Sequence, residues 1–247
     1  MTEHEAELIG GKNPVVEALR SGRELNKIWI AEGLNKKSIG EILSLAKEGG
    51  IVVQSVPKQK LDGMLAINHQ GIVASVAAYA YAELEDLFSV AKARGEDPFF
   101  IILDELEDPH NLGSILRTAD ASGVHGIIIP KRRSVGLTGI VAKASTGAIE
   151  HIPVVRVNNL SQTVDELKRR GVWVAGTDAA KSVDYRLMDA TLPLAIIIGS
   201  ERILKEKCDF LYHLPMVGHV TSLNASVAAS LLMYEVLRKR QPHASER

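Results

Sequence analysis

The chain has 247 residues, 46% apolar and 24% charged, with a formal net charge of −1, which is typical of a globular protein with one large domain or two. It contains no run of 18 apolar residues and one cysteine, Cys208, which excludes a membrane-spanning helix and an intramolecular disulfide and argues against a cysteine-based zinc site. The acidic stretch MTEHEAELIG lacks the apolar segment of a signal peptide, so we expect a cytoplasmic protein.

Residues 1–80 alternate between expected helices and strands. NPVVEALRSG predicts a helix that Gly22 ends, and KKSIGEILSLAKEGG predicts a second helix with apolar residues at helical spacing. LNKIWIAE, IVVQSV and GIVASVAAY predict strands, and PKQKLDGML predicts a short helix. We therefore expect a small α/β domain over residues 1–80, followed by an acidic, helical connector over residues 81–98.

A second series of elements begins at Phe99. Strands are expected at FFIILDEL, HGIIIP, IPVVRV, VWVAGTDA, LPLAIIIGSE and DFLYHLPM, and helices at NLGSILRTADASG, GLTGIVAKAS, LSQTVDELKRRG and the stretch after Asn224. Several strands are continuously apolar, which is typical of a parallel sheet covered on both faces. We expect an α/β domain with an open, mostly parallel sheet over residues 99–241 and a polar tail over residues 242–247.

Several well-known site motifs are missing from the sequence. There is no G-x-G-x-x-G after the first strand, no G-x-x-x-x-G-K-[ST], no G-x-S-x-G and no H-E-x-x-H. This argues against a dinucleotide-dependent oxidoreductase, a P-loop enzyme, an α/β-hydrolase and a zinc peptidase. The eight histidines are scattered without the spacing of metal ligands, so we expect no metal site.

Ligands of parallel sheets gather beyond the carboxyl ends of the strands, and polar residues follow several of the expected strands. Asn111 and Arg117 are six residues apart, which on one helix places the side chains about 240° apart around its axis. Both reach one site only if Asn111 lies at or before the helix N-cap. The alternative is a helix capped by Asn111 with a surface pair between Arg117 and Asp120. Glu201, after Gly199 and Ser200, could equally cap a helix.

Three basic clusters occur in the second part of the chain. They are Lys131-Arg132-Arg133, Lys168-Arg169-Arg170 and Arg238-Lys239-Arg240. Such a cluster is either a solvated face or a nucleic-acid contact. The composition therefore permits an RNA partner without arguing for one.

Three stretches, in this order, resemble the successive motifs of the SpoU–TrmH family of RNA methyltransferases: DPHNLGSILRTADASGVHGIII, AIIIGSE and LPMVGHVTSLNASVAASLLMYEVLR. The resemblance covers residues 99–240. NHQGIVASVAAY and the small domain before it resemble the substrate-binding domain of many members. With KRRSVGLTGIVAKASTGAIEHIPV between the motifs, the chain is most similar to the subgroup that acts on a guanosine of 23S ribosomal RNA.

The resemblance implies methyl transfer from S-adenosylmethionine to a ribose 2′-hydroxyl of RNA, a deep trefoil knot in the C-terminal domain, and a homodimer whose sites draw on both subunits. It places Asn111, Arg117, Glu201, Ser222 and Asn224 among the polar residues of the catalytic site. It places Thr177, Gly199, Leu214, Met216, Ser222, Leu223 and Asn224 in the cofactor pocket. Ser222 and Asn224 are thus expected both to start the last helix and to face the cofactor.

The reaction requires that the 2′-hydroxyl lose its proton as it attacks the methyl group. Arg117 is a poor base because a guanidinium stays protonated in proteins. We therefore expect Arg117 to stabilise the developing alkoxide or to bind the adjacent phosphate, with the proton acceptor left open. Asn111 would orient Arg117, and Glu201 would support the site and position the substrate.

One departure from the family concerns the second motif. It normally continues as a glycine-rich G-S/A-E-G-x-G turn, whereas here Glu201 runs directly into Arg202-Ile203-Leu204. A true deletion would alter the cofactor and RNA loops. The missing turn favours one alternative, an RNA-binding protein of the same fold with impaired catalysis. The nearest enzyme alternative to a 23S ribosomal RNA enzyme is a transfer-RNA guanosine 2′-O-methyltransferase.

The last helix carries Val227, Leu231, Tyr234 and Leu237 roughly on one face. This face could be buried in the core or at a dimer interface, and the sequence alone leaves both open. By the resemblance we expect the interface.

Overall fold

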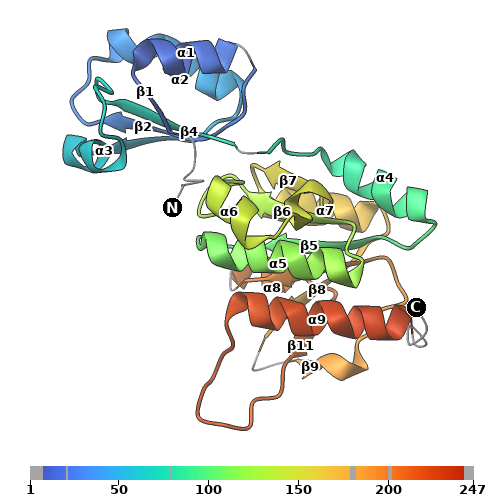
Figure 1. Ribbon diagram of the computed structural model, residues 1–247. Helices are drawn as coiled ribbons and strands as arrows, with labels where there is room; N and C mark the ends of the chain where they lie inside the picture. Colours follow the sequence, from blue (N-terminus) through green and yellow to red (C-terminus); the bar gives the residue numbers. More distant parts are fainter. Residues whose placement is uncertain (1–7, 21, 78, 179–181, 200–201, 242–247) are drawn as a thin grey trace. The chain divides into compact units, whose positions relative to one another are not determined.

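The computed structural model describes residues 8–241 except 21, 78, 179–181 and 200–201 (Figure 1). The chain divides into two compact units. Unit 1 consists of residues 1–80 and 136–143, and unit 2 consists of residues 81–135 and 144–247.

Unit 1 is a four-stranded sheet with helices on both faces. The strand order is β1-β4-β2-β3, in which β4 runs antiparallel to β1 and β2, and β2 runs parallel to β3. Its elements are β1 (Leu8–Gly10), α1 (Lys12–Arg20), β2 (Leu25–Ala31), α2 (Lys36–Glu48), β3 (Val53–Val56), α3 (Lys58–Met64) and β4 (Ile72–Val76).

Alternation along β2 explains how both faces of this sheet are covered. Ile28 and Ile30 belong to an apolar cluster that includes residues of α1 and α2, whereas Trp29 and Ala31 pack in a second cluster with Leu61 of α3. Successive side chains of a strand point to opposite faces. The helices and strands expected for residues 11–76 are confirmed, and the short strand β1 was not anticipated.

Unit 2 contains a seven-stranded sheet within its described residues, in the order β7-β6-β5-β10-β8-β11-β9. Every pairing in this sheet is parallel, so the expected α/β class and parallel sheet are confirmed. The strands are β5 (Phe99–Leu103), β6 (Gly126–Pro130), β7 (Val154–Val157), β8 (Trp173–Thr177), β9 (Val183–Asp184), β10 (Leu194–Ile198) and β11 (Phe210–His213). The central strands β5 and β10 are buried along their whole length.

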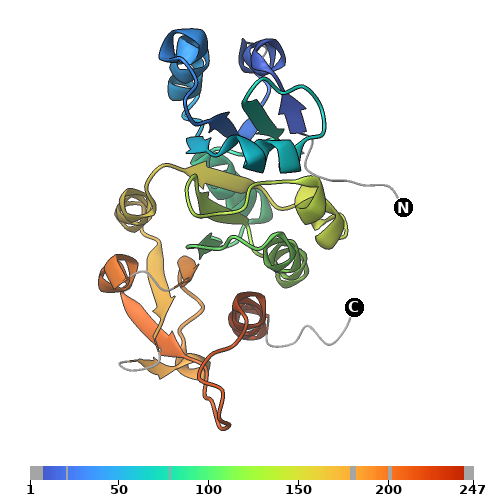
Figure 2. The same ribbon diagram turned by 90° about the vertical axis from the view of Figure 1, so that its left-hand side faces the viewer.

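Helices cover both faces of this sheet, and Figure 2 shows α5 and α9 on one side with α7 and α8 on the other. An apolar cluster joins the inner faces of α4, α7 and α8 to alternate residues of the strands, such as Phe100, Val174 and Ile197. The helices of unit 2 are α4 (Leu84–Arg94), α5 (Pro109–Ser122), α7 (Leu160–Arg169), α8 (Arg202–Lys207) and α9 (Ala225–Arg240), with 3₁₀ turns at Ala148–Glu150 and Tyr185–Leu187. The remaining helix, α6 (Gly139–Ala144), belongs to unit 1 except for its last residue.

The segment 81–98 differs from the expected connector because its helix α4 belongs to the core of unit 2. Leu87 is fully buried and packs in the same cluster as Phe100. A Cβ added at Gly126 would lie 2.2 Å from Leu87 Cγ, so the glycine makes room for this leucine. The acidic composition of α4 suggested an exposed connector, but the helix also carries an apolar face that packs on the sheet.

No helix in the described ranges is long and apolar enough to cross a membrane. The trefoil knot that the resemblance implies stays a prediction.

Candidate functional site

The carboxyl ends of the parallel strands of unit 2 share one edge of the sheet, and three of the expected cofactor residues lie there. Thr177 ends β8, Gly199 directly follows β10, and Leu214 directly follows β11. These three strands are neighbours in the order β10-β8-β11, and Tyr212 of β11 pairs with Thr177. Since adjacent strands lie about 4.8 Å apart, the three positions form a continuous row of backbone along this edge.

Gly199 sits at a close approach between two strand ends. Its φ is 151°, and an added Cβ would lie 2.6 Å from Asp104 Cβ and 2.8 Å from the Asp104 carbonyl oxygen. The Asp104 amide also donates to the Ile198 carbonyl at 2.9 Å. Only glycine fits at this close approach between the ends of β5 and β10, which we call the cradle.

Asp104 was not anticipated as part of this edge. It follows β5 directly and is 7% exposed. The sequence signal for Asp104 was a carboxylate directly after a wholly apolar strand. A carboxylate in such a place is buried only when it has polar partners.

Helix α5 begins earlier than expected, and this changes the geometry of Asn111 and Arg117. Asp108 is the N-cap, with its carboxylate accepting from the His110 amide at 3.0 Å, and Pro109 is the first helical residue. The expectation that Asn111 caps the helix is therefore wrong. Asn111 lies inside the first turn, so Asn111 and Arg117 of the same chain are on different faces of α5.

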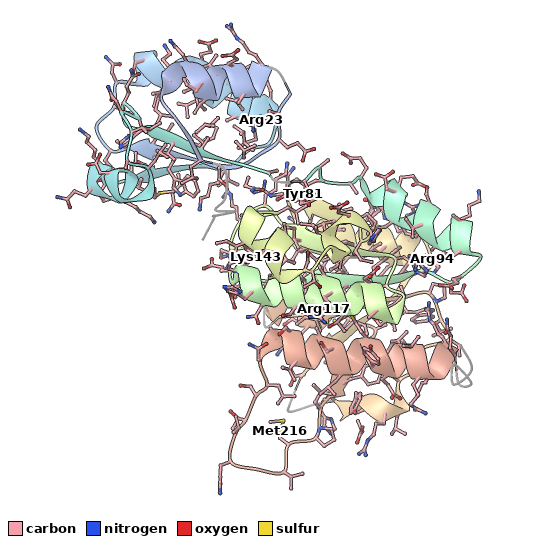
Figure 3. The ribbon with its side chains drawn as sticks, viewed as in Figure 1. Arg23, Tyr81, Arg94, Arg117, Lys143 and Met216 are labelled. Carbon is pink, nitrogen blue, oxygen red and sulfur yellow. The ribbon has the colours of Figure 1, made fainter. Side chains whose placement is uncertain are left out.

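Arg117 is exposed on α5 beside α9 (Figure 3). It makes no hydrogen bond or ion pair with any residue that the structure describes, so the alternative of a surface pair with Asp120 is wrong. Next to it, the Thr118 and Ser230 hydroxyl oxygens lie 3.1 Å apart and join α5 to α9. The Arg117 guanidinium is thus available to an anion.

The segment from Leu214 to Asn224 leads from β11 to α9 without regular structure, and Figure 3 places Met216 on it. Its side chains are mostly exposed: Met216 is 39%, Val217 100% and Leu223 38% exposed, and Ser222 is exposed as well.

Asn224 is the N-cap of α9. Its Oδ1 accepts from the Ser226 amide at 2.8 Å and from the Ser226 hydroxyl at 2.6 Å, so the prediction that this residue starts the last helix is confirmed. Ser222 lies two residues before the cap and has no capping contact among the described residues. Glu201 and Ser200 lie outside the described residues, and α8 begins immediately after them at Arg202.

Each basic cluster has at least one residue in an ion pair, and in the first cluster Arg133 pairs with Glu105 at 2.5 Å. Lys168 pairs with Asp209 at 2.7 Å, Arg170 with Glu85 at 2.9 Å and Arg238 with Glu235 at 2.7 Å. These contacts favour solvated, ion-paired faces for the second and third clusters.

The first cluster lies at the carboxyl edge, directly after β6. Burial lowers the pKa of Lys131, the neighbouring charge of Arg156 lowers it further, and Glu83 raises it in part. Arg156 in turn lies over the Tyr81 ring, 5.2 Å from its centre, and Figure 3 labels Tyr81. Its place directly after β6 makes this cluster a candidate for a phosphate contact.

Two family descriptions match the chain. The SpoU rRNA methylase family matches residues 98–234, and the family described as RNA 2′-O ribose methyltransferase substrate binding matches residues 8–82. The first match spans more than half of the chain and contains the whole edge described above. The protein belongs to the SpoU rRNA methylase family and is a methyltransferase of the TrmH/SpoU type, as the resemblance implied.

Relatives and solved structures agree with this assignment. YacO of Bacillus subtilis (strain 168), assigned to the TrmH family of tRNA/rRNA methyltransferases, is 63% identical over 237 residues, with 94% of this chain and 95% of YacO covered. The SpoU methyltransferase AviRb of Streptomyces viridochromogenes, solved with the cofactor AdoMet, superposes with a TM-score of 0.60 at 25% identity, covering 95% of this chain and 90% of AviRb. An AdoMet-bound rRNA methyltransferase of Sinorhizobium meliloti gives a TM-score of 0.58 at 25% identity, covering 94% and 87%.

Proposed function

We propose that the protein transfers a methyl group from S-adenosylmethionine to the ribose 2′-hydroxyl of a guanosine in 23S ribosomal RNA. The observation that carries the proposal is the row of Thr177, Gly199 and Leu214 at neighbouring strand ends, in a chain whose two units both match families of RNA methylation. The choice of ribosomal RNA rests on the arrangement of the motifs. The relatives' name, tRNA/rRNA methyltransferase, keeps transfer RNA as the second candidate.

S-adenosylmethionine is the methyl donor, and the carboxyl edge suits it. Gly199 has no side chain to cover the backbone at the end of β10, and Thr177 and Leu214 lie at the neighbouring ends of β8 and β11. Met216, Ser222, Leu223 and Asn224 follow on the exposed segment before α9, where their side chains would bind the cofactor from the other side. When bound, the sulfonium supplies an activated methyl group.

We assign Arg117 the role of stabilising negative charge on the 2′-oxygen or on the adjacent phosphate. A preorganised cation at a developing oxyanion accelerates a reaction because it needs no reorganisation. Ser222 and Asn224 remain proposed site residues beside it. Glu201 remains proposed from the family motif alone.

We further propose that the site is completed across a homodimer, with Asn111 and Arg117 acting from different subunits. Within one chain these two side chains lie on different faces of α5, so Asn111 cannot easily orient its own Arg117. The face of α9 that lies beside Arg117 also exposes apolar side chains, with Val227 48%, Leu231 41% and Tyr234 50% exposed. Such a stripe is typical of a subunit interface.

The missing glycine turn bears on activity. The alignment with YacO is 237 positions long, but it covers 94% of the 247-residue chain, which is about 232 residues. At the few remaining positions of the alignment YacO has a residue and this chain has a gap. This supports a deletion relative to the relatives. An RNA-binding protein with impaired catalysis is the alternative that such a deletion favours.

The decisive experiment measures methyl transfer from labelled S-adenosylmethionine to unmodified large-subunit ribosomal RNA and, in parallel, to unmodified transfer RNA. The labelled ribose is then mapped. A variant with the family's glycine-rich turn inserted after Glu201 is assayed beside the unaltered chain. Label on one guanosine 2′-oxygen of ribosomal RNA would establish the proposed reaction.

Other outcomes separate the alternatives. Label on transfer RNA alone would replace the proposed substrate, and transfer by the restored variant alone would show that the deletion impairs catalysis. RNA binding without transfer by either chain would favour the RNA-binding protein. For the dimer, sedimentation should give a mass of two chains, and Leu231→Glu should give one.

A further inference from the structure

Unit 1 contains a pocket of about 310 Å³ that the proposed reaction does not use. The pocket lies where β2 ends, beside α3 and the loop that leads from α3 to β4. Its wall includes Glu32, Gly33, Lys58, Ile67, Asn68 and Gln70. We call residues 67–71 the recognition loop.

The recognition loop is held rigidly by a buried histidine. His69 is 3% exposed, and its Nδ1 accepts from the Gly71 amide at 3.0 Å. Nε2 therefore carries the proton and donates to Asp62 Oδ1 at 2.9 Å. Since both ring nitrogens are engaged, the imidazole fastens the loop to its own backbone and to α3.

Backbone contacts fix the other end of the loop. The Ile72 amide donates to the His69 carbonyl and the Ala31 amide to the Gly71 carbonyl, each at 2.8 Å. Gly71 has φ 78°, and a Cβ there would lie 3.0 Å from Leu34 Cδ1. The loop thus has one well-defined conformation before any ligand arrives.

Within this rigid loop, Gln70 adopts an unfavourable backbone conformation. Its φ is 52°, in the left-handed region that glycine and asparagine tolerate better. Backbone strain of this kind is concentrated at sites of function, where the side chain is needed in a particular direction. We infer that the glutamine amide at this position has a ligand to bind.

The side chains that line the pocket suit a nucleobase. Asn68 and Gln70 are exposed, and neither amide has a hydrogen-bond partner among the residues that the structure describes. Side-chain amides can donate to and accept from the edge of a base. Ile67, 58% exposed, offers an apolar surface to the face of a base, and Lys58, exposed at the same pocket, offers a cation to a phosphate.

We propose that the recognition loop and its pocket bind one unpaired nucleobase of the RNA substrate and thereby select the RNA. An unpaired base is required because the base edges of an RNA duplex lie in a deep, narrow groove that side chains do not read. The inference rests on the proposed function, since it takes the RNA that receives the methyl group as the ligand.

Two substitutions test this pocket in the full chain. Gln70→Gly removes the amide and relieves the backbone strain, so it should raise the melting temperature while it weakens RNA binding. Asn68→Ala removes the second amide. Each should raise the Kd for an unmodified large-subunit ribosomal RNA transcript roughly tenfold, the usual discrimination of one good base contact.

The kinetic readout separates recognition from chemistry. Both variants should raise the KM for RNA while kcat and the affinity for S-adenosylmethionine, measured by calorimetry, stay unchanged. Gln54→Ala, which removes an exposed amide from β3 outside the pocket, should leave every quantity unchanged. A photoreactive side chain introduced at Ile67 should crosslink to a nucleotide in a loop or bulge.

The inference and the proposed function can fail separately. Normal RNA affinity in Gln70→Gly and Asn68→Ala, with methyl transfer by the unaltered chain, would overturn the recognition loop and leave the function standing. Crosslinks confined to paired nucleotides would overturn the unpaired base. Weakened RNA binding in the variants, without methyl transfer by any chain, would support the pocket and remove the proposed reaction.

Discussion

The two edges of the seven-stranded sheet in unit 2 are built in opposite ways. At the amino edge, the Arg240 guanidinium donates to the carbonyls of Ala190, Leu192, Asp97 and Pro98 at 2.6–3.3 Å. At the carboxyl edge, the segment after β11 carries the exposed side chains of Ser222 and Asn224. On α5, which covers one face of the sheet, the Arg117 guanidinium is exposed and has no partner in the described part of the chain. One arginine is used to hold strands and helices together, and the other is left available for a ligand.

The difference separates the residues that stabilise the fold from the residues that are available for binding and reaction. Hydrogen bonds at the amino edge are satisfied within the chain, so changes there should affect folding. The carboxyl edge carries exposed polar side chains and the segment before α9, so changes there should affect binding and reaction. Sites that need free polar groups are generally less stable than their surroundings.

The largest expected effect is on catalysis, at Arg117 of α5. Arg117→Ala should lower the rate of methyl transfer by a factor of about 10²–10³, because removal of one oxyanion-stabilising group costs about 2.7–4 kcal/mol. The melting temperature should not change, since the side chain is exposed. Arg169→Ala, an exposed arginine of α7, serves as the matched control in the same assay. A normal rate in Arg117→Ala would remove this residue from the site.

The next effect is on stability at the amino edge. Arg240→Ala removes the donor to four carbonyl groups, of which only that of Pro98 has another donor among the described residues, the Leu194 amide, and should lower the free energy of unfolding by roughly 3 kcal/mol. The rate per folded molecule should remain that of the unaltered protein. Chemical denaturation of this variant and of Arg238→Ala, where the arginine is exposed and paired only with Glu235, measures the difference. Equal stabilities would contradict the contrast between the edges.

A smaller effect is expected at the cradle. Gly199→Ala introduces a Cβ 2.6 Å from Asp104 Cβ and should cost about 2 kcal/mol through overpacking. Because the strand ends must move apart, the affinity for S-adenosylmethionine should fall as well. Calorimetric titration tests this against Gly40→Ala in α2, where an added Cβ meets nothing within 4 Å and the backbone is helical. Unchanged cofactor affinity would place the cofactor elsewhere.

The smallest effect concerns pH and the amino edge. Burial lowers the pKa of His125 below 6.5, although its hydrogen bond to Glu96 opposes this. Nδ1 accepts from the Phe99 amide at 3.0 Å and the Nε2 to Glu96 Oε2 distance is 2.9 Å. A second proton on the ring would sit on Nδ1 and point at the hydrogen of the Phe99 amide.

The sign of the pH dependence follows from this lowered pKa. Below pH 6.5 the unfolded chain binds a proton that the folded chain does not, so stability is complete above pH 6.5 and falls as the pH drops towards the folded-state pKa. His125→Gln should flatten this fall, by about 1 kcal/mol per pH unit at most. Denaturation curves at several pH values measure it, and His151→Gln at an exposed histidine should leave the slope as it was.

The sequence predicted the sheet of unit 2 well because its strands are continuous apolar runs, which have few alternatives. It failed at the start of α5, where Asp108 and Pro109 form a better N-terminal signal than Asn111. It also failed at α4, where the burial of Leu87 depends on the space left by Gly126, a residue far away in the chain.

The candidate site was predictable only as a set of strand ends. Which strands become neighbours depends on the sheet order, so the row of Thr177, Gly199 and Leu214 could not be read from the spacing of these residues. Which basic residues are ion-paired was equally hidden, because the partners of Arg133, Lys168 and Arg170 are Glu105, Asp209 and Glu85, all distant in the sequence. The pocket in unit 1 gave no sequence signal beyond a short polar loop.

The pairing of β5 with β10 has a consequence for how the protein forms. Phe99 pairs with Leu194 and Leu103 with Ile198, so the centre of the sheet joins segments that are far apart along the chain. Contacts of this kind form slowly, because the intervening chain must be ordered before they are made. Before β5 pairs with β10, the run FFIIL is an exposed apolar strand that can pair with another chain. We therefore expect unit 1, whose strands are close in sequence, to fold first, and unit 2 to be the part that relies on chaperones.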